Sequence, residues 1–182
     1  TSGHARISIT SIYPKKRILM QQPANSVSTE TMIRTGAEYI ASLRNRDLNV
    51  YLFGERIAEP VDHPIIRPSI NAVAKTYDLA STVPELATAV SPYTGERINR
   101  FLHIAESAED LVLQNKMQRR LGQLTGTCFQ RCVGMDALNS LFSVSYEVDE
   151  QHGTEYHARF KSFVTDMQQH GYVIGGAMTD VK

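Results

Sequence analysis

The stretch Ser107–Gly126, SAEDLVLQNKMQRRLGQLTG, decides the fold class of this chain because it carries the pattern of one long amphipathic helix. Its first residues, Ser-Ala-Glu-Asp, are a helix-start signal. Apolar residues then recur at helical spacing and predict a buried stripe, made of Leu113, Met117, Leu121 and Leu124. Gly126 is expected to interrupt this helix.

Helix signals also flank this stretch. We expect further helices after a capping box at Thr35–Glu38, after a cap at Asp62, near Ala137, and between Gly153 and Gly171. Strand formers on both sides of Gly54 predict a small hairpin, whereas Ser81–Glu96 is rich in turn residues. The sequence therefore predicts a mainly α fold with minor strands.

The composition limits the classes of function. The 182 residues are 42% hydrophobic and 21% charged, which is typical of one globular domain of ordinary size. The 19 basic and 19 acidic residues balance to a net charge of zero, so neither nucleic acid nor an anionic membrane surface is expected as a partner. No apolar run is long enough to span a membrane. Two cysteines fit a reduced, cytoplasmic protein better than a disulfide framework.

The chain divides into three parts by its patterning. Residues 1–31 lack helical periodicity and are expected to be a poorly ordered extension. Residues 32–171 carry the helical patterns and are expected to form one helical domain. Tyr172–Ile174, followed by two glycines, reads as the opening of an extended element, so residues 172–182 are expected to be the truncated start of a β domain.

Cys128 and Cys132 are the only cysteines and stand four residues apart. If their segment is helical, both thiols lie on one face and can ligate one metal centre together, although a four-coordinate site needs two more ligands. The alternative is two small buried apolar residues, which burial statistics alone favour. The spacing of the nearby histidines does not point to the pair.

Two other polar features have simpler interpretations. His63 is an acid–base candidate, but a helix-start residue bonded to the backbone is the more common role for a residue in that place. Lys116, Arg119 and Arg120 could bind an anion such as a phosphate, although such charges more often form a solvated helix face.

Several of these stretches together resemble the 4-hydroxyphenylacetate 3-hydroxylase superfamily. The superfamily motifs are Tyr51–Ile57 (YLFGERI) and Asp62–Asn71 (DHPIIRPSIN). Three other stretches are similar to its 4-hydroxybutyryl-CoA dehydratase branch: Lys116–Gln123, Cys128–Ala137 and Gly176–Asp180. The likeness covers the chain from Met32 to Lys182.

The resemblance implies an acyl-CoA dehydrogenase-like fold, in which a helical N-terminal domain precedes a β middle domain and a C-terminal helical bundle that builds a homotetramer. It also implies two cofactors, FAD and a [4Fe–4S] cluster. Cys128 and Cys132 match cluster ligands, which reverses the burial argument. A histidine and a third cysteine complete the cluster site in segments that this chain does not possess.

The resemblance assigns the remaining site residues as well. Met178, Thr179 and Asp180 match the start of a stretch that contacts FAD, although Val181 stands where proline is usual. Arg119 and Gln130 occupy positions expected near the active centre.

The implied reaction removes water from 4-hydroxybutyryl-CoA to give crotonyl-CoA, with isomerisation of vinylacetyl-CoA as a second activity. The acyl-CoA is the substrate, and the chain alone is expected to be inactive. One alternative is a flavin-dependent aromatic hydroxylase of the same superfamily, against which the cysteine spacing argues because that branch needs no cluster. The other is a non-catalytic assembly module encoded by a split gene.

Overall fold

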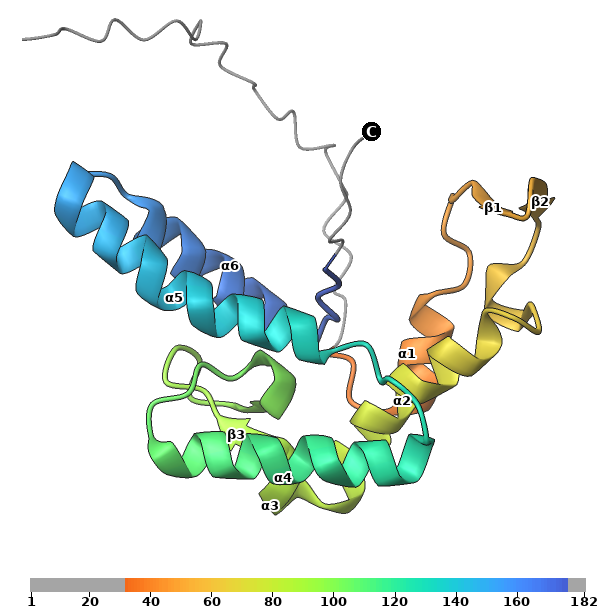
Figure 1. The fold of residues 1–182 in the computed structure, drawn as a ribbon, viewed down its shortest axis with the longest axis horizontal. Helices are drawn as coiled ribbons and strands as arrows, with labels where there is room; N and C mark the ends of the chain where they lie inside the picture. The colour runs from red at the N-terminus through yellow and green to blue at the C-terminus, as the bar shows by residue number, and fades with distance from the viewer. Residues whose placement is uncertain (1–31, 177–182) are drawn as a thin grey trace, which may run out of the picture. The chain divides into compact units, whose positions relative to one another are not determined.

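The computed structural model describes residues 32–176. Its helices are α1 (Gly36–Ser42), α2 (Arg67–Thr82), α3 (Pro84–Ala87), α4 (Ala108–Thr125), α5 (Cys132–His152) and α6 (Tyr156–His170), as Figure 1 shows. The short strands are β1 (Val50–Leu52), β2 (Glu55–Ile57), β3 (Thr88–Val90) and β4 (Arg97–Asn99), and the 3-10 helices are η1 (Pro60–Asp62) and η2 (Arg100–Leu102). The mainly α prediction is confirmed. The predicted extension at residues 1–31 lies outside the described residues.

The predicted capping box begins α1. The hydroxyl of Thr35 accepts a hydrogen bond from the Glu38 amide at 3.1 Å, and the Glu38 carboxylate accepts one from the Thr35 amide at 2.9 Å. Hydrogen bonds from the backbone amides of Arg34 and Thr35 lower the pKa of Glu38. The next turn places Tyr39 against Tyr77 of α2, with ring centroids 5.3 Å apart.

Two antiparallel hairpins interrupt the helices. In the predicted one, β1 pairs with β2, and Val50 lies opposite Ile57. Phe53 and Gly54 form its turn with φ of 52° and 84°, which is the sign that a type I′ turn requires at both central residues. The second hairpin joins β3 to β4 within and just after the segment that the sequence marked only as turn-rich.

The start of α2 differs from the prediction. The helix begins at Arg67, whereas Asp62 lies in η1 and does not cap it. The residue before a proline is held out of the helical region, and His63, which precedes Pro64, accordingly has ψ of 129°. The Asp62 carboxylate instead accepts hydrogen bonds from Arg44 at 2.7 and 2.8 Å and from Arg67 at 2.9 Å. Arg44 therefore lowers the pKa of Asp62.

The long helix α4 follows the predicted pattern closely. Ser107 caps it by accepting a hydrogen bond from the Asp110 amide at 3.1 Å, and Gly126 ends it with φ of 61°. Met117 and Leu121 are completely buried, as predicted. Leu113 is only half-buried and Leu124 is 49% exposed, so the fully buried part of the stripe is shorter than predicted at both ends.

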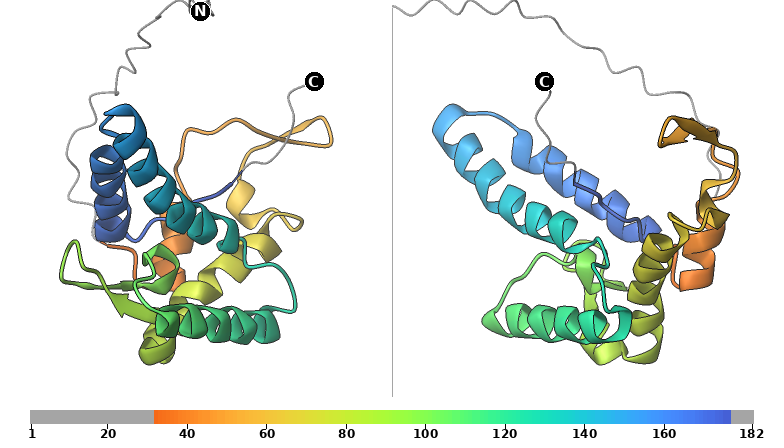
Figure 2. Two further views of the ribbon diagram at one scale, coloured as in Figure 1. Left: turned by 60° about the vertical axis from the view of Figure 1, so that its left-hand side comes forward. Right: turned by 45° about the vertical axis from the view of Figure 1, so that its right-hand side comes forward.

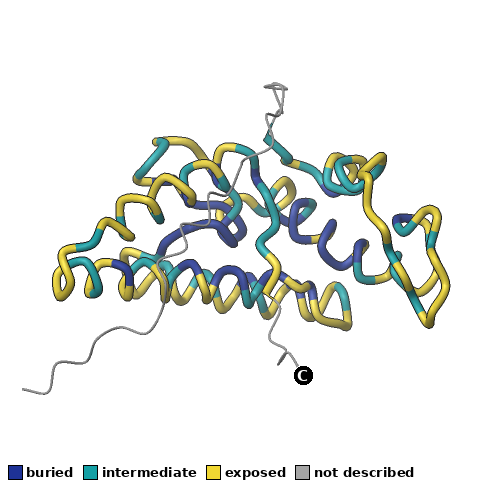
Figure 3. Tube along the Cα trace, turned by 90° about the horizontal axis from the view of Figure 1, so that it is seen from above, coloured by how far each residue is buried: buried dark blue, intermediate teal, exposed yellow. Residues whose placement is uncertain are grey.

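Two clusters of buried side chains hold these elements together. The first joins α2, α3, η2 and α4 to the start of α5: Leu79, Ala87, Phe101, Met117, Leu121, Phe129 and Met135. The second joins β4 and η2 to α5 and α6, which lie side by side in every view (Figures 1 and 2): Ile98, Leu102, Ile104, Leu138 and Val164. Burial runs through α2, whereas the β1–β2 hairpin is exposed or half-buried (Figure 3).

The chain after α6 returns to the start of α5. Gly171 ends α6 with φ of 69°, and its carbonyl accepts a hydrogen bond from the Tyr77 hydroxyl at 2.6 Å. Residues 172–176 then pass the first turn of α5 without forming a strand. A Cβ built on Gly134 would collide with the carbonyl oxygen of Ile174 and lie 2.9 Å from its Cβ. Only a glycine allows this close approach.

Candidate functional site

Both cysteines lie in or at the end of a short connection between α4 (ending at Thr125) and α5 (beginning at Cys132). We call residues 126–132 the cysteine loop. Cys132 is the first residue of α5, but Cys128 precedes the helix, so the helical condition for placing both thiols on one helix face is not met. Cys128 is exposed and Cys132 is half-buried against the first apolar cluster. The interpretation as two buried apolar residues is therefore wrong for Cys128.

Residues alternate between buried and exposed along this loop. Phe129 and Arg131 are 8% and 2% exposed, whereas Cys128 and Gln130 are exposed. Gln130 adopts a left-handed backbone conformation with φ of 57°, which a residue with a side chain rarely adopts. Its amide lies 3.4 Å from the Cys128 sulfur and donates a weak hydrogen bond to it. The two buried residues are thus anchors on either side of Gln130.

Both anchors belong to one continuous series of contacts between rings and the Arg131 guanidinium, in which the Phe101 and Phe129 rings are tilted by 50° to each other. The Arg131 guanidinium carbon lies 4.7 Å from the ring centroid of Tyr77 and 4.9 Å from that of Phe101. The Phe101 ring in turn lies 5.6 Å from Phe129, centroid to centroid. Since Tyr77 also stacks on Tyr39, the stack connects α1, α2 and η2 to the cysteine loop. We call these five groups the arginine stack.

Arg131 is buried without a carboxylate partner among residues 32–176. One guanidinium nitrogen donates to the Thr76 hydroxyl at 3.0 Å and another to the Tyr172 carbonyl at 3.4 Å. Burial lowers the pKa of Arg131, while the nearby Tyr77 and Tyr39 oppose that effect. An arginine in this setting still carries its charge, because its ordinary pKa is far above neutrality. The site therefore contains a fixed interior positive charge.

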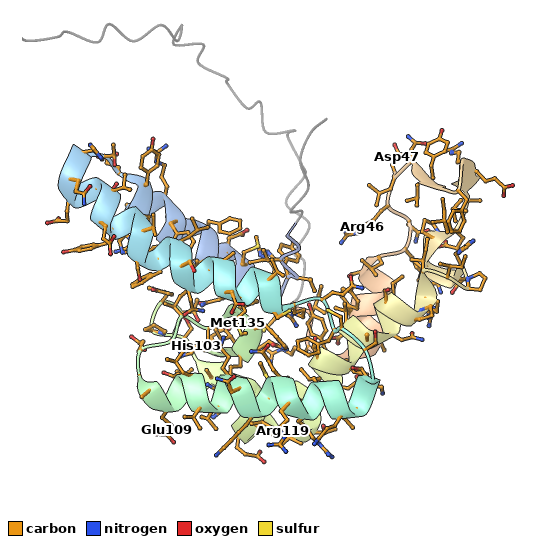
Figure 4. The ribbon with its side chains drawn as sticks, in the orientation of Figure 1. Arg46, Asp47, His103, Glu109, Arg119 and Met135 are labelled. Carbon is orange, nitrogen blue, oxygen red and sulfur yellow. The ribbon has the colours of Figure 1, made fainter. Side chains whose placement is uncertain are left out.

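The other candidates lie apart from this loop or have simple roles. Arg119, Lys116 and Arg120 are exposed on α4, and Figure 4 shows Arg119 on that helix. Within the described part of the chain, no hydrogen bond joins Arg119 to Gln130 or to either cysteine. His63 accepts a hydrogen bond from the Ile65 amide at 3.3 Å, which fits its interpretation as a backbone-bonded residue near the helix start.

The donor set fits one part of a metal centre. No group of three or more His, Cys, Asp or Glu side chains that could hold a metal occurs within residues 32–176. The exposed Cys128 and half-buried Cys132 leave two sulfur donors near the surface, which suits a cluster whose other ligands come from outside the described residues. The predicted FAD contacts Met178, Thr179 and Asp180 also lie outside the described residues.

Sequence reasoning missed Arg131 and Gly134. The contacts of Arg131 with Thr76 and Tyr172 bridge 55 and 41 residues, and no local pattern announces them. The sequence offers one weak signal, because Arg131 directly precedes a helix whose first turn contains apolar residues. Many arginines occupy such a place, so this signal does not identify a buried one.

No helix within residues 32–176 has both the length and the apolar character that crossing a membrane would require.

Comparisons with known proteins agree with one another. A family described as 4-hydroxyphenylacetate 3-hydroxylase N terminal matches residues 35–182. The 4-hydroxybutyryl-CoA dehydratase/vinylacetyl-CoA-Delta-isomerase of Clostridium aminobutyricum is 50% identical over 153 residues, which cover 83% of this chain and 31% of that protein. The oxygenase component of 4-hydroxyphenylacetate 3-monooxygenase from Thermus thermophilus is 34% identical over 80 residues, covering 44% of this chain and 17% of that protein.

Solved structures show the same relationship. The oxygen-tolerant archaeal 4-hydroxybutyryl-CoA dehydratase from N. maritimus superposes with a TM-score of 0.80 at 71% identity, covering 82% of this chain and 30% of that chain. The oxygenase component of 4-hydroxyphenylacetate 3-monooxygenase, solved with FAD, has a TM-score of 0.53 at 24% identity and shows the fold alone. The chain thus spans about a third of the length of the dehydratases. It belongs to the 4-hydroxyphenylacetate 3-hydroxylase family, whose N-terminal, acyl-CoA dehydrogenase-like helical domain it contains.

Proposed function

We propose that this chain provides the N-terminal helical domain of a 4-hydroxybutyryl-CoA dehydratase, which forms crotonyl-CoA and isomerises vinylacetyl-CoA. The observation that carries the proposal is the 71% identity to an archaeal dehydratase over 82% of the chain, with a TM-score of 0.80. Since the chain spans about a third of the dehydratases, the β domain, the C-terminal helical bundle, the homotetramer and the acyl-CoA substrate are parts of the same proposal. So is a cytoplasmic location.

Cys128 and Cys132 are proposed as two ligands of a [4Fe–4S] cluster. Thiolates are the donors that such clusters use, and the exposed position of Cys128 leaves its sulfur open to a ligand. When bound, the cluster supplies a Lewis acid for the leaving hydroxyl, and FAD supplies one-electron chemistry. The described residues provide two sulfurs, so the remaining ligands are proposed to come from segments that the longer relatives contain.

The residues of this chain orient the substrate and the cofactors. The Gln130 side chain is exposed between the two cysteines, and its amide can both donate to and accept from a substrate oxygen. Arg119 is proposed as a second active-centre residue, because an exposed guanidinium suits an anionic group of an acyl-CoA. Met178, Thr179 and Asp180 are proposed to contact FAD.

A flavin-dependent hydroxylase is the second candidate. It is favoured by the monooxygenase oxygenase component that is 34% identical over 80 residues. The cysteine pair argues against it, because flavin hydroxylation requires no pair of thiolates. The two candidates differ in their products, which makes them separable by assay.

The test is a chimera in which residues 32–182 replace the matching segment of the archaeal dehydratase. We expect Cys128→Ser to lower crotonyl-CoA formation by about 100-fold or more, because a lost ligand costs at least as much as a lost outer-shell partner. Iron content and circular dichroism are measured on the same samples, and Thr127→Ala is the matched control for a change in the loop.

Normal turnover by the Cys128→Ser chimera would refute the ligand assignment. Hydroxylation of 4-hydroxyphenylacetate by the unmodified chimera with reduced flavin and oxygen, without dehydration, would favour the second candidate instead.

A further inference from the structure

Local hydrogen bonds fix the start of the cysteine loop but do little for its central residues. The Thr125 hydroxyl donates to the Thr127 carbonyl at 2.8 Å and accepts from the Thr127 amide at 3.4 Å. Among residues 128–131 there is only the weak hydrogen bond from the Gln130 amide to the Cys128 sulfur, and Gln130 is in a left-handed conformation that is unfavourable for a residue with a side chain. Such a conformation persists only where the surroundings fix it. The fixing contacts must therefore come from the buried neighbours, Phe129 and Arg131.

Arg131 makes the larger share of these contacts. Its guanidinium stacks between Tyr77 and Phe101 and donates hydrogen bonds to Thr76 and to the Tyr172 carbonyl. It thereby connects the loop to α2, to η2 and to the segment after α6. Phe129 reaches the same stack through Phe101.

The buried charge of Arg131 in the arginine stack needs a physical explanation. A buried cation without a carboxylate is costly, and an apolar side chain of similar size would fill the stack without that cost. A planar guanidinium, however, can stack on two rings and donate in its own plane at once, which neither Lys nor Met can do. Arg131 does both: its guanidinium lies over the Tyr77 and Phe101 rings and also donates hydrogen bonds to Thr76 and to the Tyr172 carbonyl.

We propose that Arg131 is a positioning residue: it fixes the cysteine loop so that Cys128 and Gln130 stay exposed while Cys132 stays against the core. The inference rests on the proposed function only in giving this loop a cofactor to hold. Its immediate consequence is a rigid loop in which the Cys128 thiol is more accessible than the Cys132 thiol, and this holds for the chain without any cofactor.

The experiment uses the 182-residue chain and measures the two thiols separately. Iodoacetamide labelling followed by mass spectrometry gives the alkylation rates of Cys128 and Cys132, and hydrogen exchange gives the opening of the loop amides. In the wild type, Cys128 is expected to react faster because it is exposed. In Arg131→Met, we expect Cys132 labelling and loop exchange to rise about tenfold, as the loss of hydrogen bonds from a charged group predicts.

Three comparisons separate positioning from general stabilisation. The amides of α6 should exchange as in the wild type, because a loss of global stability would accelerate them too. Arg131→Lys should not restore the wild-type rates, because it keeps the charge and loses the planar fork. Arg56→Met, on the exposed hairpin, is the matched control for loss of an arginine and should change neither thiol.

A second variant covers the case in which Arg131→Met does not fold. Thr76→Val removes one hydrogen-bond acceptor of Arg131 at nearly constant volume, together with the hydrogen bond that the Thr76 hydroxyl donates to the Val73 carbonyl within α2. A several-fold rise in Cys132 labelling is expected. Unchanged thiol rates and loop exchange in Thr76→Val and in a folded Arg131→Met would overturn the inference. Full restoration by Arg131→Lys would also overturn it. The two proposals can also fail separately. If the Arg131→Met chain has a loosened loop but the unmodified chimera binds no iron, the positioning role is upheld and the proposed function is refuted.

Discussion

Phe53 and Gln130 both adopt left-handed backbone conformations, with φ of 52° and 57°, but for different reasons. Phe53 is 86% exposed and precedes Gly54, so the two-residue turn of its own hairpin imposes the conformation. Gln130 has no glycine beside it and lies between two buried residues that contact distant elements. The first conformation has a local cause and the second has a tertiary cause. Of the two, only the conformation of Gln130 therefore depends on contacts outside its own loop.

Removing one aromatic ring from each loop should give the largest difference in stability between the two loops. We expect Phe129→Ala to lower the free energy of unfolding by about 3 kcal/mol, because Phe129 is buried against Phe101. Phe53→Ala should change it by about 0.5 kcal/mol or less, because Phe53 is exposed. Urea denaturation measures both. Equal losses would show that both loops depend on local structure alone.

A substitution at Gly134, in the first turn of α5 just after the cysteine loop, should have the next largest effect on stability. Gly134→Ala places a methyl group against the Ile174 carbonyl, and such overpacking should destabilise the chain by about 2 kcal/mol. Gly175→Ala is the matched control, since nothing lies within 4 Å of a Cβ there. Thermal unfolding of the two variants tests the contact. A neutral Gly134→Ala would mean that residues 172–176 do not pack on α5.

Improving the local turn should have a smaller effect of the opposite sign. Phe53→Asn creates the Asn-Gly pair that type I′ turns prefer and should stabilise the chain by about 0.5 kcal/mol. Urea denaturation is again the measurement, with Arg56→Asn in the neighbouring strand as a control that gains nothing. A loss of stability in Phe53→Asn would contradict a purely local cause.

Acid should distinguish the two loops with the smallest effect. The hydrogen bond from Arg44 lowers the pKa of Asp62 below its ordinary value of 3.8, so this contribution to stability is present above pH 3.8. It is lost as the pH falls further, through the pKa of the folded state. Arg131 has no carboxylate partner among the described residues. Between pH 4.5 and 3, hydrogen exchange, corrected for its intrinsic pH dependence, should therefore accelerate more at residues 50–57 than in the cysteine loop.

The parts of the fold that sequence predicted are those with local causes. The reciprocal bonds of Thr35 and Glu38 span three residues, and the periodicity of Met117 and Leu121 spans one turn. Both predictions are confirmed. The predicted Asp62 cap is wrong because Pro64 excludes His63 from the helical region, so the helix cannot begin directly after Asp62.

The candidate site was predictable only through the family likeness. The sequence singles out the cysteine pair, but the shared face depends on both residues being helical, and Cys128 lies before α5. The arginine stack joins residues that are far apart in the sequence, from Tyr39 to Arg131, so no window of the chain contains its pattern. The Cys128→Ser chimera tests the ligand assignment, and the roles of Arg119 and Gln130 stay predictions.

The contact between Gly134 and Ile174 has a mechanical consequence. The first turn of α5 and the strand-like run behind it touch backbone to backbone, with no flexible side chain between them to absorb a displacement. A displacement of residues 172–176 is therefore expected to shift the first turn of α5, the turn that begins with the thiol of Cys132.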